Sequence, residues 1–294
     1  LAYELSGDRL AAFLGGLVFA FFPNRLGHAL GGHLPQLTAY WFPLYALSLV
    51  WLVRRPTCRR GLWCGVCLGL SLLVNLQHTA YLLVPFTLVF LLWHWRSWRD
   101  VRFLKGLALA LAVAVLVTVP FFIPFLEDKL QGGLSFLKAG GTVRNSIDLL
   151  AYLAPSPTHP LLSRWGLLPG YVDRLFTQPR DVEEGLAYLG IVPLLLAAWG
   201  IVRGRSDRWM WAALGGASLM LALGPLLKVG GALASYTIEG QATYIPLPYT
   251  LLKALPLYEW GRTPGRLSET AAFALAVLVA YGVADLRGRL RGRR

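Results

Sequence analysis

Long apolar stretches recur along the chain and are separated by short segments that carry nearly all of its charges. The stretches occupy residues 10–22, 37–53, 61–74, 79–93, 106–126, 185–202, 209–227 and 271–283. A helix of about 20 apolar residues crosses the hydrocarbon core of a bilayer, and a shorter helix crosses only where the bilayer is locally thinner. The pattern therefore predicts an all-α fold: a polytopic transmembrane helical bundle of about eight spans, with outer-face loops and short interfacial helices.

The basic residues give the predicted spans an orientation. Clusters of arginine and lysine at 54–60, 96–105, 203–208 and 287–294 all fall on one side if eight spans alternate. Positive charge next to short loops favours the cytoplasmic side. The chain is thus predicted to be a multi-pass protein of the cell (plasma) membrane with a cytoplasmic C-terminus. Its two long loops, at 127–184 and 228–270, are expected at the outer face.

Composition supports a membrane class and excludes a nucleic-acid partner. Apolar residues make up 56% of the chain, charged residues 15%, and the mean hydropathy is +0.54. The net charge of +13 comes from the short clusters between spans, which read as topology signals. Because the chain begins at Leu1 without a signal peptide, we expect residues 1–294 to be a single transmembrane domain cut from a longer chain.

Cys64 and Cys67 form a C-x-x-C pair, for which packing is favoured over a redox or metal role. Cys64 and Cys67 lie within an apolar stretch, with Cys58 before it and no second pair or histidine nearby. We expect them to be small packing residues on one helix face. No metal site is predicted from them.

The interiors of the predicted spans contain almost no ionisable side chains. Proton-coupled transporters and pumps usually need such groups near the midplane of the membrane. Polar residues gather instead at the outer ends of the spans. This favours a site at the outer surface that acts on a substrate with a lipid tail and an exposed head group.

The stretch 248–270 holds the basic residues Lys253, Arg262 and Arg266 at the predicted outer face. Basic residues are unusual there, so we expect an anionic ligand such as a lipid phosphate, which matches the planar donors of arginine. Snorkelling to lipid head groups is the alternative. The two arginines can share one phosphate only if residues 263–265 are helical or tightly turned. A short amphipathic helix over 248–257 would bring Tyr258 and Glu259 to the rim, where aromatic residues also serve as a membrane belt.

Histidines form a second group of candidates at the outer face. His28 and His33 are five residues apart, a poor match to the spacing of two metal ligands on one helix, so phosphate contact or catalysis competes with simple capping of backbone oxygens. His78 follows Gln77 in a tight turn, and His159 lies in the first long loop.

Acidic residues supply the candidates for a catalytic base. Glu127 and Asp128 stand at a predicted membrane edge, and Asp148 lies in the same loop. Transfer of a glycosyl group to a hydroxyl needs a carboxylate within hydrogen-bond reach and a way to stabilise the departing phosphate. Asp181, Glu183 and Glu184 instead suit the first turn of the helix predicted from residue 185.

Three segments carry a resemblance to bacterial polytopic membrane proteins of the GT-C glycosyltransferase superfamily and its YfhO-like group. They are AAFLGGLVFAFFPNRLGHALGGHLPQLTAYWFPLYALSL, DLLAYLAPSPTHP and LPYTLLKALPLYEWGRTPGRL, which are spread over most of the chain. The resemblance implies that Arg262 and Arg266 match arginines of that group, and that His33 matches its Gly-His pair. The usual catalytic acid lies in the first outer loop of such enzymes, which would precede Leu1.

The resemblance implies an enzyme that transfers a sugar from a polyprenyl-phosphate-linked donor to an acceptor at the extracytoplasmic face, among membrane lipids. A divalent metal is possible, since its use varies across the superfamily. Two alternatives remain: a transporter or flippase of lipid-linked glycans, and a non-catalytic membrane scaffold of the same fold. A charged groove across the bilayer would favour the first, and an absent upstream acid the second.

Overall fold

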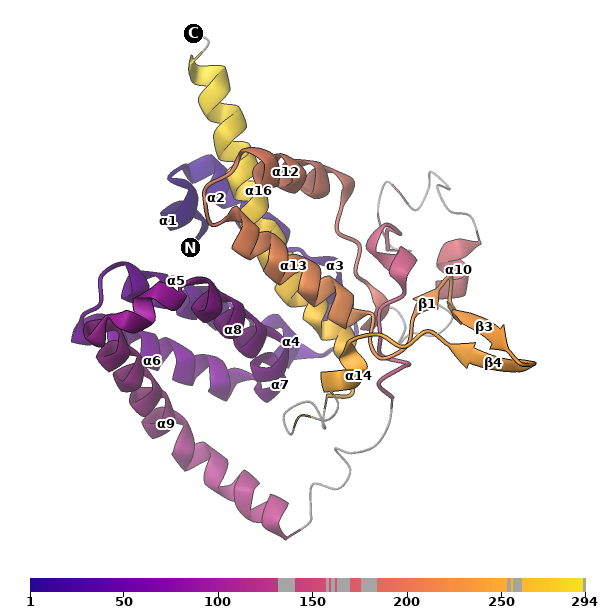
Figure 1. The fold of residues 1–294 in the computed structure, drawn as a ribbon, viewed down its shortest axis with the longest axis horizontal. Coiled ribbons are helices and arrows are strands. Elements are labelled where there is room, and N and C mark those ends of the chain that lie inside the picture. The colour runs from indigo at the N-terminus through magenta and orange to yellow at the C-terminus, as the bar shows by residue number, and fades with distance from the viewer. Residues whose placement is uncertain are drawn as a thin grey trace. The chain divides into compact units, whose positions relative to one another are not determined.

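The computed structural model describes residues 1–131, 141–156, 159, 162, 170–175, 184–252, 255 and 261–292, and it is mostly helical (Figure 1). The chain divides into two compact units. One, which we call the α9 unit, comprises Leu1 and Leu34–Ala139. The other, the α16 unit, comprises Ala2–His33 and Gly140–Arg294.

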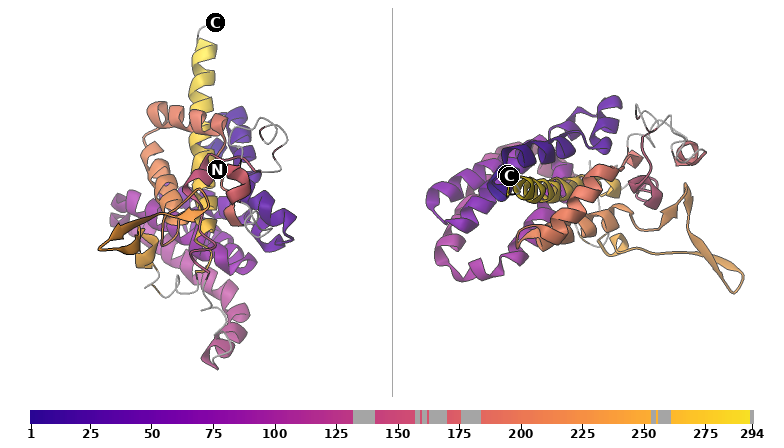
Figure 2. Two further views of the ribbon diagram at one scale, coloured as in Figure 1. Left: turned by 90° about the vertical axis from the view of Figure 1, so that its right-hand side faces the viewer. Right: turned by 90° about the horizontal axis from the view of Figure 1, so that it is seen from above.

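A long helix forms the centre of the α16 unit. Helix α16, Leu267–Gly292, is buried from its first residue to Gly282. Around it pack α2 (Arg9–Ala20), α12 (Ile191–Arg203) and α13 (Arg208–Ala222), while α1 (Ala2–Ser6) and α3 (Pro23–Leu30) make smaller contacts. The last turns of α16 extend beyond these neighbours (Figure 2).

Small residues let these helices approach closely. A Cβ added to Gly15 of α2 would lie 2.5 Å from the carbonyl oxygen of Ala276 in α16. Gly200 of α12 similarly faces the carbonyl of Leu278, and Gly282 faces that of Leu196. Such stripes of small residues are typical of helix packing in membranes. The hydrophobic effect does not drive helices together there, and close approach of their backbones increases van der Waals contact instead.

The α9 unit is a set of apolar helices. It contains α4 (Leu34–Leu37), α5 (Trp41–Arg54), α6 (Cys58–Val74), α7 (Leu76–His78), the π-helix η1 (Thr79–Leu83), α8 (Val84–Trp93), the 3-10 helix η2 (Trp95–Arg99) and α9 (Val101–Leu130). Gly61, Gly65 and Gly69 of α6 line its contact with α9, and a Cβ on Gly65 would lie 2.5 Å from the Ala110 carbonyl oxygen. Cys64 and Cys67 are free thiols buried in α6, as expected of packing residues.

Two small β-hairpins in the α16 unit were not expected in an all-α fold. Strand β1 (Lys228–Val229) pairs with β2 (Ala232–Leu233), and β3 (Ser235–Ile238) pairs with β4 (Gln241–Tyr244), both antiparallel. Asp148, next to the 3-10 helix η4 (Leu149–Tyr152), holds the first turn by accepting hydrogen bonds from the amides of Gly230 and Gly231. The second hairpin extends away from the helices of its unit (Figures 1 and 2).

Three further elements complete the described part of the α16 unit. These are α10 (Tyr171–Leu175), α14 (Tyr249–Leu252) and the 3-10 helix η5 (Pro264–Arg266), which leads directly into α16. The expected amphipathic helix over 248–257 is represented by α14, and much of the rest of that segment lies outside the described residues.

Each of the eight apolar stretches contains a helix, but residues 186–190 and 223–227 at the ends of two of them are not helical, and the helix lengths differ from the expectation. Among the described residues, three helical segments are long and apolar enough to cross a membrane: Leu34–Arg54, Val101–Asp128 and Pro264–Gly292. A fourth candidate combines Arg9–Ala20 with Pro23–Leu30, which are bent by 44°. Thr79–Trp93 and Ile191–Arg203 are apolar but shorter. The candidate span Pro264–Gly292 begins before the predicted span 271–283, so it includes Arg266 and Glu269.

Candidate functional site

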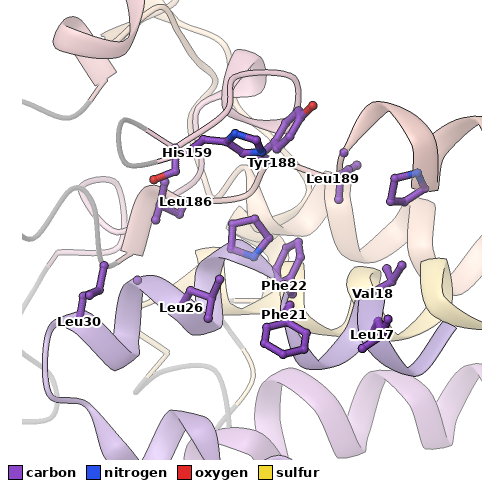
Figure 3. Close-up of a pocket in the computed structure, with 15 residues that line it drawn as sticks. Leu17, Val18, Phe21, Phe22, Leu26, Leu30, His159, Leu186, Tyr188 and Leu189 are labelled. Atoms are coloured by element: carbon purple, nitrogen blue, oxygen red, sulfur yellow. The ribbon is translucent and has the colours of Figure 1, made fainter. Parts of the chain in front are cut away.

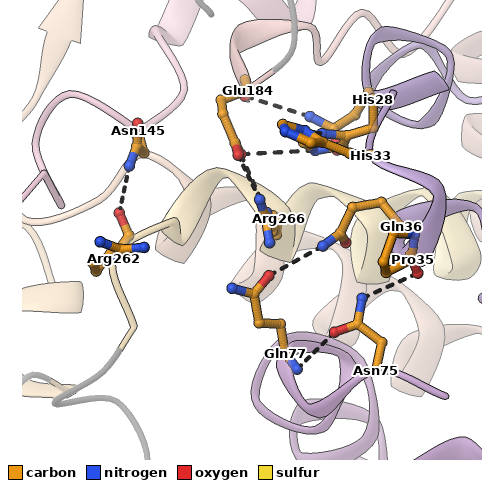
Figure 4. A network of polar contacts seen from close by, with 11 residues as sticks. His28, His33, Pro35, Gln36, Asn75, Gln77, Asn145, Glu184, Arg262 and Arg266 are labelled. Atoms are coloured by element: carbon orange, nitrogen blue, oxygen red, sulfur yellow. Dashed lines mark hydrogen bonds and ion pairs between the residues drawn. The ribbon is translucent and has the colours of Figure 1, made fainter. Parts of the chain in front are cut away.

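A cluster of charged and imidazole side chains lies inside the α16 unit, at the start of α16 (Figure 4). Glu184 is at its centre. Arg266 donates to both oxygens of the Glu184 carboxylate, from Nη2 at 2.6 Å and from Nε at 3.3 Å. Nε2 of His28 stands 3.7 Å from Oε2 of the same carboxylate. The side chain of Asn24 donates to the Glu184 backbone carbonyl at 3.4 Å.

Local sequence explains how these residues are presented. Pro23 begins α3 and Phe22 precedes it, so the chain turns sharply after α2 and carries Asn24, Arg25 and His28 on one short helix. Residues 264–266 form η5, which places Arg266 at the entrance to α16. The cluster therefore joins three segments that are distant in sequence: α3, Glu184 and the start of α16.

The two histidines extend this cluster toward solvent. Nδ1 of His28 lies 3.2 Å from Nδ1 of His33, so one ring donates and the other accepts. His28 is fully buried, whereas His33 is exposed. The row His33, His28, Glu184 thus runs from the surface to a largely buried carboxylate, with a hydrogen bond between the two histidines and a longer, ion-pair distance from His28 to Glu184.

A second ion pair lies deeper in the unit. Nη2 of Arg25 stands 3.5 Å from Oε2 of Glu269, whose side chain is only 1% exposed. Arg25 also donates to the Phe19 carbonyl at 3.0 Å and lies over the Phe19 ring. The other carboxylate oxygen of Glu269 and Nε of Arg25 are buried without a hydrogen-bond partner among the described residues. Such incompletely satisfied buried groups are frequent at functional sites.

The α16 unit also contains an apolar cavity of about 640 Å³ (Figure 3). Several residues that line it are close in sequence to residues of the charged cluster. Leu17, Phe21, Leu26 and Leu30 line it from α2 and α3, and Leu186, Tyr188 and Leu189 from the segment after Glu184; Ser156 and His159 add polar groups. Gly27 also lines it, and His28 follows directly. A cavity with apolar walls and few polar groups suits a lipid chain better than a sugar.

The residues predicted to bind phosphate lie in different surroundings. His28, His33 and Arg266 come together, although the guanidinium of Arg266 is taken by Glu184. Arg262 is exposed, and its backbone carbonyl accepts a hydrogen bond from Asn145 at 3.1 Å. Of residues 263–265, which would have to be helical or tightly turned for Arg262 and Arg266 to share one phosphate, Pro264 and Gly265 belong to the 3-10 helix η5 and Thr263 precedes it in a non-helical conformation. Lys253, Tyr258 and Glu259 lie outside the described residues.

The predicted acids do not join the cluster. The Asp148 carboxylate accepts hydrogen bonds from three backbone amides, of Leu150, Gly230 and Gly231, which gives it a structural role. Glu127 and Asp128 are exposed at the end of α9, in the α9 unit. Glu184, predicted to stabilise a first helical turn, precedes α12 and binds Arg266 instead.

The other two candidate histidines, His159 and His78, have contacts of their own. His159 accepts a hydrogen bond from the Leu162 amide and packs edge-on against Tyr188 in the wall of the apolar cavity. His78 is buried in the α9 unit, where Gln36 donates to Gln77, and Asn75 donates to the Pro35 carbonyl (Figure 4).

Sequence reasoning missed the roles of Arg25, Glu269 and Glu184. Opposite charges next to predicted spans were the available signal, because ionisable residues at membrane depth need partners. No group of three or more metal-ligating side chains suitable for an ion occurs within the described residues. A divalent metal therefore has no evident ligand set in that part of the chain.

The family model described as "Domain of unknown function (DUF6311)" matches residues 1–293 of this chain. No curated protein and no solved structure matches this chain.

Proposed function

We propose that this chain, which belongs to the DUF6311 family, is an integral membrane glycosyltransferase of the GT-C type. It transfers a sugar from a polyprenyl-phosphate donor to an acceptor at the extracytoplasmic face. The observation that carries this proposal is the apolar cavity of about 640 Å³, flanked in sequence by the charged cluster of His28, Glu184 and Arg266. An amphiphilic donor needs both features, one for its tail and one for its phosphate.

In this proposal Arg266 binds the donor phosphate. Its guanidinium already holds a carboxylate through two donors, the geometry that arginine also uses for phosphate. A phosphate oxygen competes with Glu184 for the same donors. Displacement frees the Glu184 carboxylate beside His28, where it accepts the proton of the acceptor hydroxyl as a general base. Arg262, exposed four residues earlier, adds a second positive charge.

The proposed topology has eight spans in the plasma membrane. The C-terminus lies in the cytoplasm. The presence of a helix in each of the eight apolar stretches supports it, as does the position of the basic clusters. The shorter helices then cross a bilayer that is locally thinned around them and their neighbours. The loops 127–184 and 228–270 lie outside.

A second candidate is a proton-coupled transporter of lipid-linked glycans. The ion pair of Arg25 with Glu269 favours it, because both residues belong to helices of candidate spans and charges there often mark transport paths. The exposed His33 and buried His28 add a proton route. With Arg25 and Glu269 inside them, these candidate spans are not free of ionisable groups.

The test uses the full-length protein in proteoliposomes with a polyprenyl-phosphate-linked, radiolabelled sugar. Arg266→Gln is expected to weaken donor binding roughly tenfold to a hundredfold, the range for charge-assisted hydrogen bonds. Arg174→Gln is the matched control, since Arg174 is exposed and belongs to α10, which contributes no residue to the cluster. Glu184→Gln is expected to keep or strengthen binding while it abolishes transfer.

The outcomes separate the two candidates. Label that moves from lipid to acceptor supports the transferase, and label that changes leaflet while still linked to lipid supports the transporter. Donor binding by Arg266→Gln equal to that of the unchanged protein would refute the phosphate role.

A further inference from the structure

A second cavity, which is lined mainly by polar residues, lies toward the opposite end of α16 from the cluster of Glu184 and Arg266. Its volume is about 290 Å³. Ser6 of α1, Arg203 and Arg205 at the α12–α13 connection, and Tyr281 and Asp285 of α16 line it. All of them belong to the α16 unit.

The single acid in this cavity wall is already engaged. Oδ2 of Asp285 accepts hydrogen bonds from Nε of Arg289 at 2.7 Å and from the Trp199 indole at 2.9 Å. Its Oδ1 accepts a longer one from Arg289. The pair Asp285 and Arg289 is close to neutral, so no further acid among the lining residues offsets Arg203 and Arg205. The carboxylate of Asp207, which accepts a hydrogen bond from the lining residue Tyr281, offsets part of that positive charge.

Arg203 and Arg205 supply that positive charge. Both are exposed, and neither guanidinium forms an ion pair with a carboxylate of the described residues within 4.0 Å. The Arg203 guanidinium lies 5.8 Å from the centre of the Trp199 ring, which restricts its orientation. Two planar donor groups therefore border one small cavity.

The connection that presents Arg205 is held in place by side chains. Nη1 of Arg208 donates to the carbonyls of Gly204 and Arg205, at 2.8 and 3.2 Å. The Tyr281 hydroxyl donates to Asp207 at 2.8 Å, which ties the connection to α16. A fixed backbone lowers the entropic cost of positioning arginine donors for a ligand.

The level of this cavity along α16 matches a membrane surface. Asp285 follows Arg266 by 19 residues, or about 28 Å at the helical rise, and the hydrocarbon core of a bilayer is about 30 Å thick. Residues 270–284 between them carry no charge. If one end of α16 meets the head groups at Arg266, the cavity meets those of the other leaflet.

We propose that this cavity binds the phosphate head group of an anionic phospholipid from that leaflet, with Arg203 and Arg205 as the donors. The ligand chemistry is a phosphate ester with net negative charge, and the lipid supplies it at high local concentration. The acyl chains would follow the apolar sides of the neighbouring helices. This inference does not depend on glycosyl transfer.

The test compares lipid retention by native mass spectrometry of the full-length protein in neutral detergent, with phosphatidylglycerol or phosphatidylcholine added. Arg203→Gln with Arg205→Gln is expected to weaken phosphatidylglycerol binding roughly thirtyfold, the product of two basic contacts at a membrane surface. Arg9→Gln with Arg291→Gln removes the same charge from exposed positions in the same unit and is expected to change little. Arg203→Lys with Arg205→Lys keeps the charge without the planar fork and is expected to be intermediate.

Inorganic phosphate distinguishes the two sources of the ligand. We expect it to compete weakly, because it lacks the anchoring chains. Equal affinity for inorganic phosphate and phosphatidylglycerol would overturn the lipid assignment, and equal losses in the Arg203/Arg205 and Arg9/Arg291 variants would overturn the site itself.

Discussion

Arg25 and Glu269 show how a single pair of opposite charges is accommodated in the interior of the α16 unit. Each residue would be very costly there alone, because no water is available to solvate it. The carboxylate is 3.5 Å from the guanidinium, which also uses a backbone carbonyl and the Phe19 ring. The pair thus has partial compensation, and its two halves depend on each other.

Removal of one partner is expected to destabilise the fold more than removal of both. Glu269→Leu alone leaves the Arg25 charge without its acid and should cost about 3 kcal/mol of unfolding free energy. Arg25→Met with Glu269→Leu should cost clearly less than the sum of the single changes. Thermal unfolding in detergent, followed by circular dichroism, measures both. Additive losses would show that the two charges are independent.

Asp8 gives a prediction for pH dependence. It caps α2 by accepting from the Ala11 amide at 2.9 Å, and this hydrogen bond, with further help from Arg287, lowers the pKa of Asp8 below its ordinary 3.8. A carboxyl whose folded pKa is lowered contributes stability above its unfolded pKa, and this stability is lost as pH falls through the folded pKa. The stability advantage over Asp8→Asn should therefore be full above about pH 5 and shrink below pH 4. A constant difference in Tm from pH 3 to 6 would contradict this role.

Residue chemistry was only partly predictable. Arg266, His28 and His33 were identified because polar groups at span ends invite a functional reading, and the structure brings them together. The pairing of Arg25 with Glu269 joins residues 244 positions apart. The charges next to the spans are visible in the sequence, but helix packing determines which of them pair.

At the scale of elements, neighbouring glycines of α2 differ sharply in their surroundings. A Cβ on Gly15 would meet the Ala276 carbonyl oxygen at 2.5 Å and the Ala280 Cβ at 3.3 Å, whereas a Cβ on Gly16 meets nothing within 4 Å. The contact of α2 with α16 therefore requires glycine at one position and tolerates alanine at the next.

This difference provides a matched pair of variants. Gly15→Ala should push α2 from α16 and lower the unfolding free energy by about 1 to 3 kcal/mol. Gly16→Ala should be neutral or stabilise by up to about 1 kcal/mol, since alanine favours the helix. Tm values of the two purified variants suffice. A loss in Gly16→Ala as large as that in Gly15→Ala would argue against the close α2–α16 contact.

The apolar pattern predicted every helix of the eight stretches, because long runs of apolar residues specify burial in protein or lipid. It missed the hairpins, whose strands have two to four residues. A turn signal was present: Gly230 and Gly231 both have positive φ, as do Glu239 and Gly240. These are the conformations of tight hairpin turns, but strands this short give no alternating pattern to accompany them.

At the scale of the molecule, the distribution of charge along α16 matches that of a helix that crosses a bilayer. Arg266 and Glu269 stand at its start, and Asp285, Arg287 and Arg289 near its end, with an uncharged stretch between them. Charged groups at both ends of an apolar helix of this length define two aqueous boundaries. The exposed β3–β4 hairpin precedes the first boundary in sequence, and residue 291 follows the second.

Labelling of single cysteines tests whether α16 crosses the membrane in the proposed direction. In a background with Cys58, Cys64 and Cys67 replaced by serine, Ser235→Cys is expected to react with a membrane-impermeant maleimide in right-side-out vesicles. Arg291→Cys should react only after the vesicles are opened. Both positions are exposed in the structure, so access depends on the membrane and not on burial.

Opened vesicles serve as the control, in which both cysteines should react. Labelling of both in sealed vesicles would mean that α16 does not separate the two positions, and the placement of two charged levels at opposite surfaces would fail. Labelling of Arg291→Cys alone would keep the crossing and reverse the direction. The donor cluster would then face the cytoplasm, which is incompatible with transfer at the extracytoplasmic face.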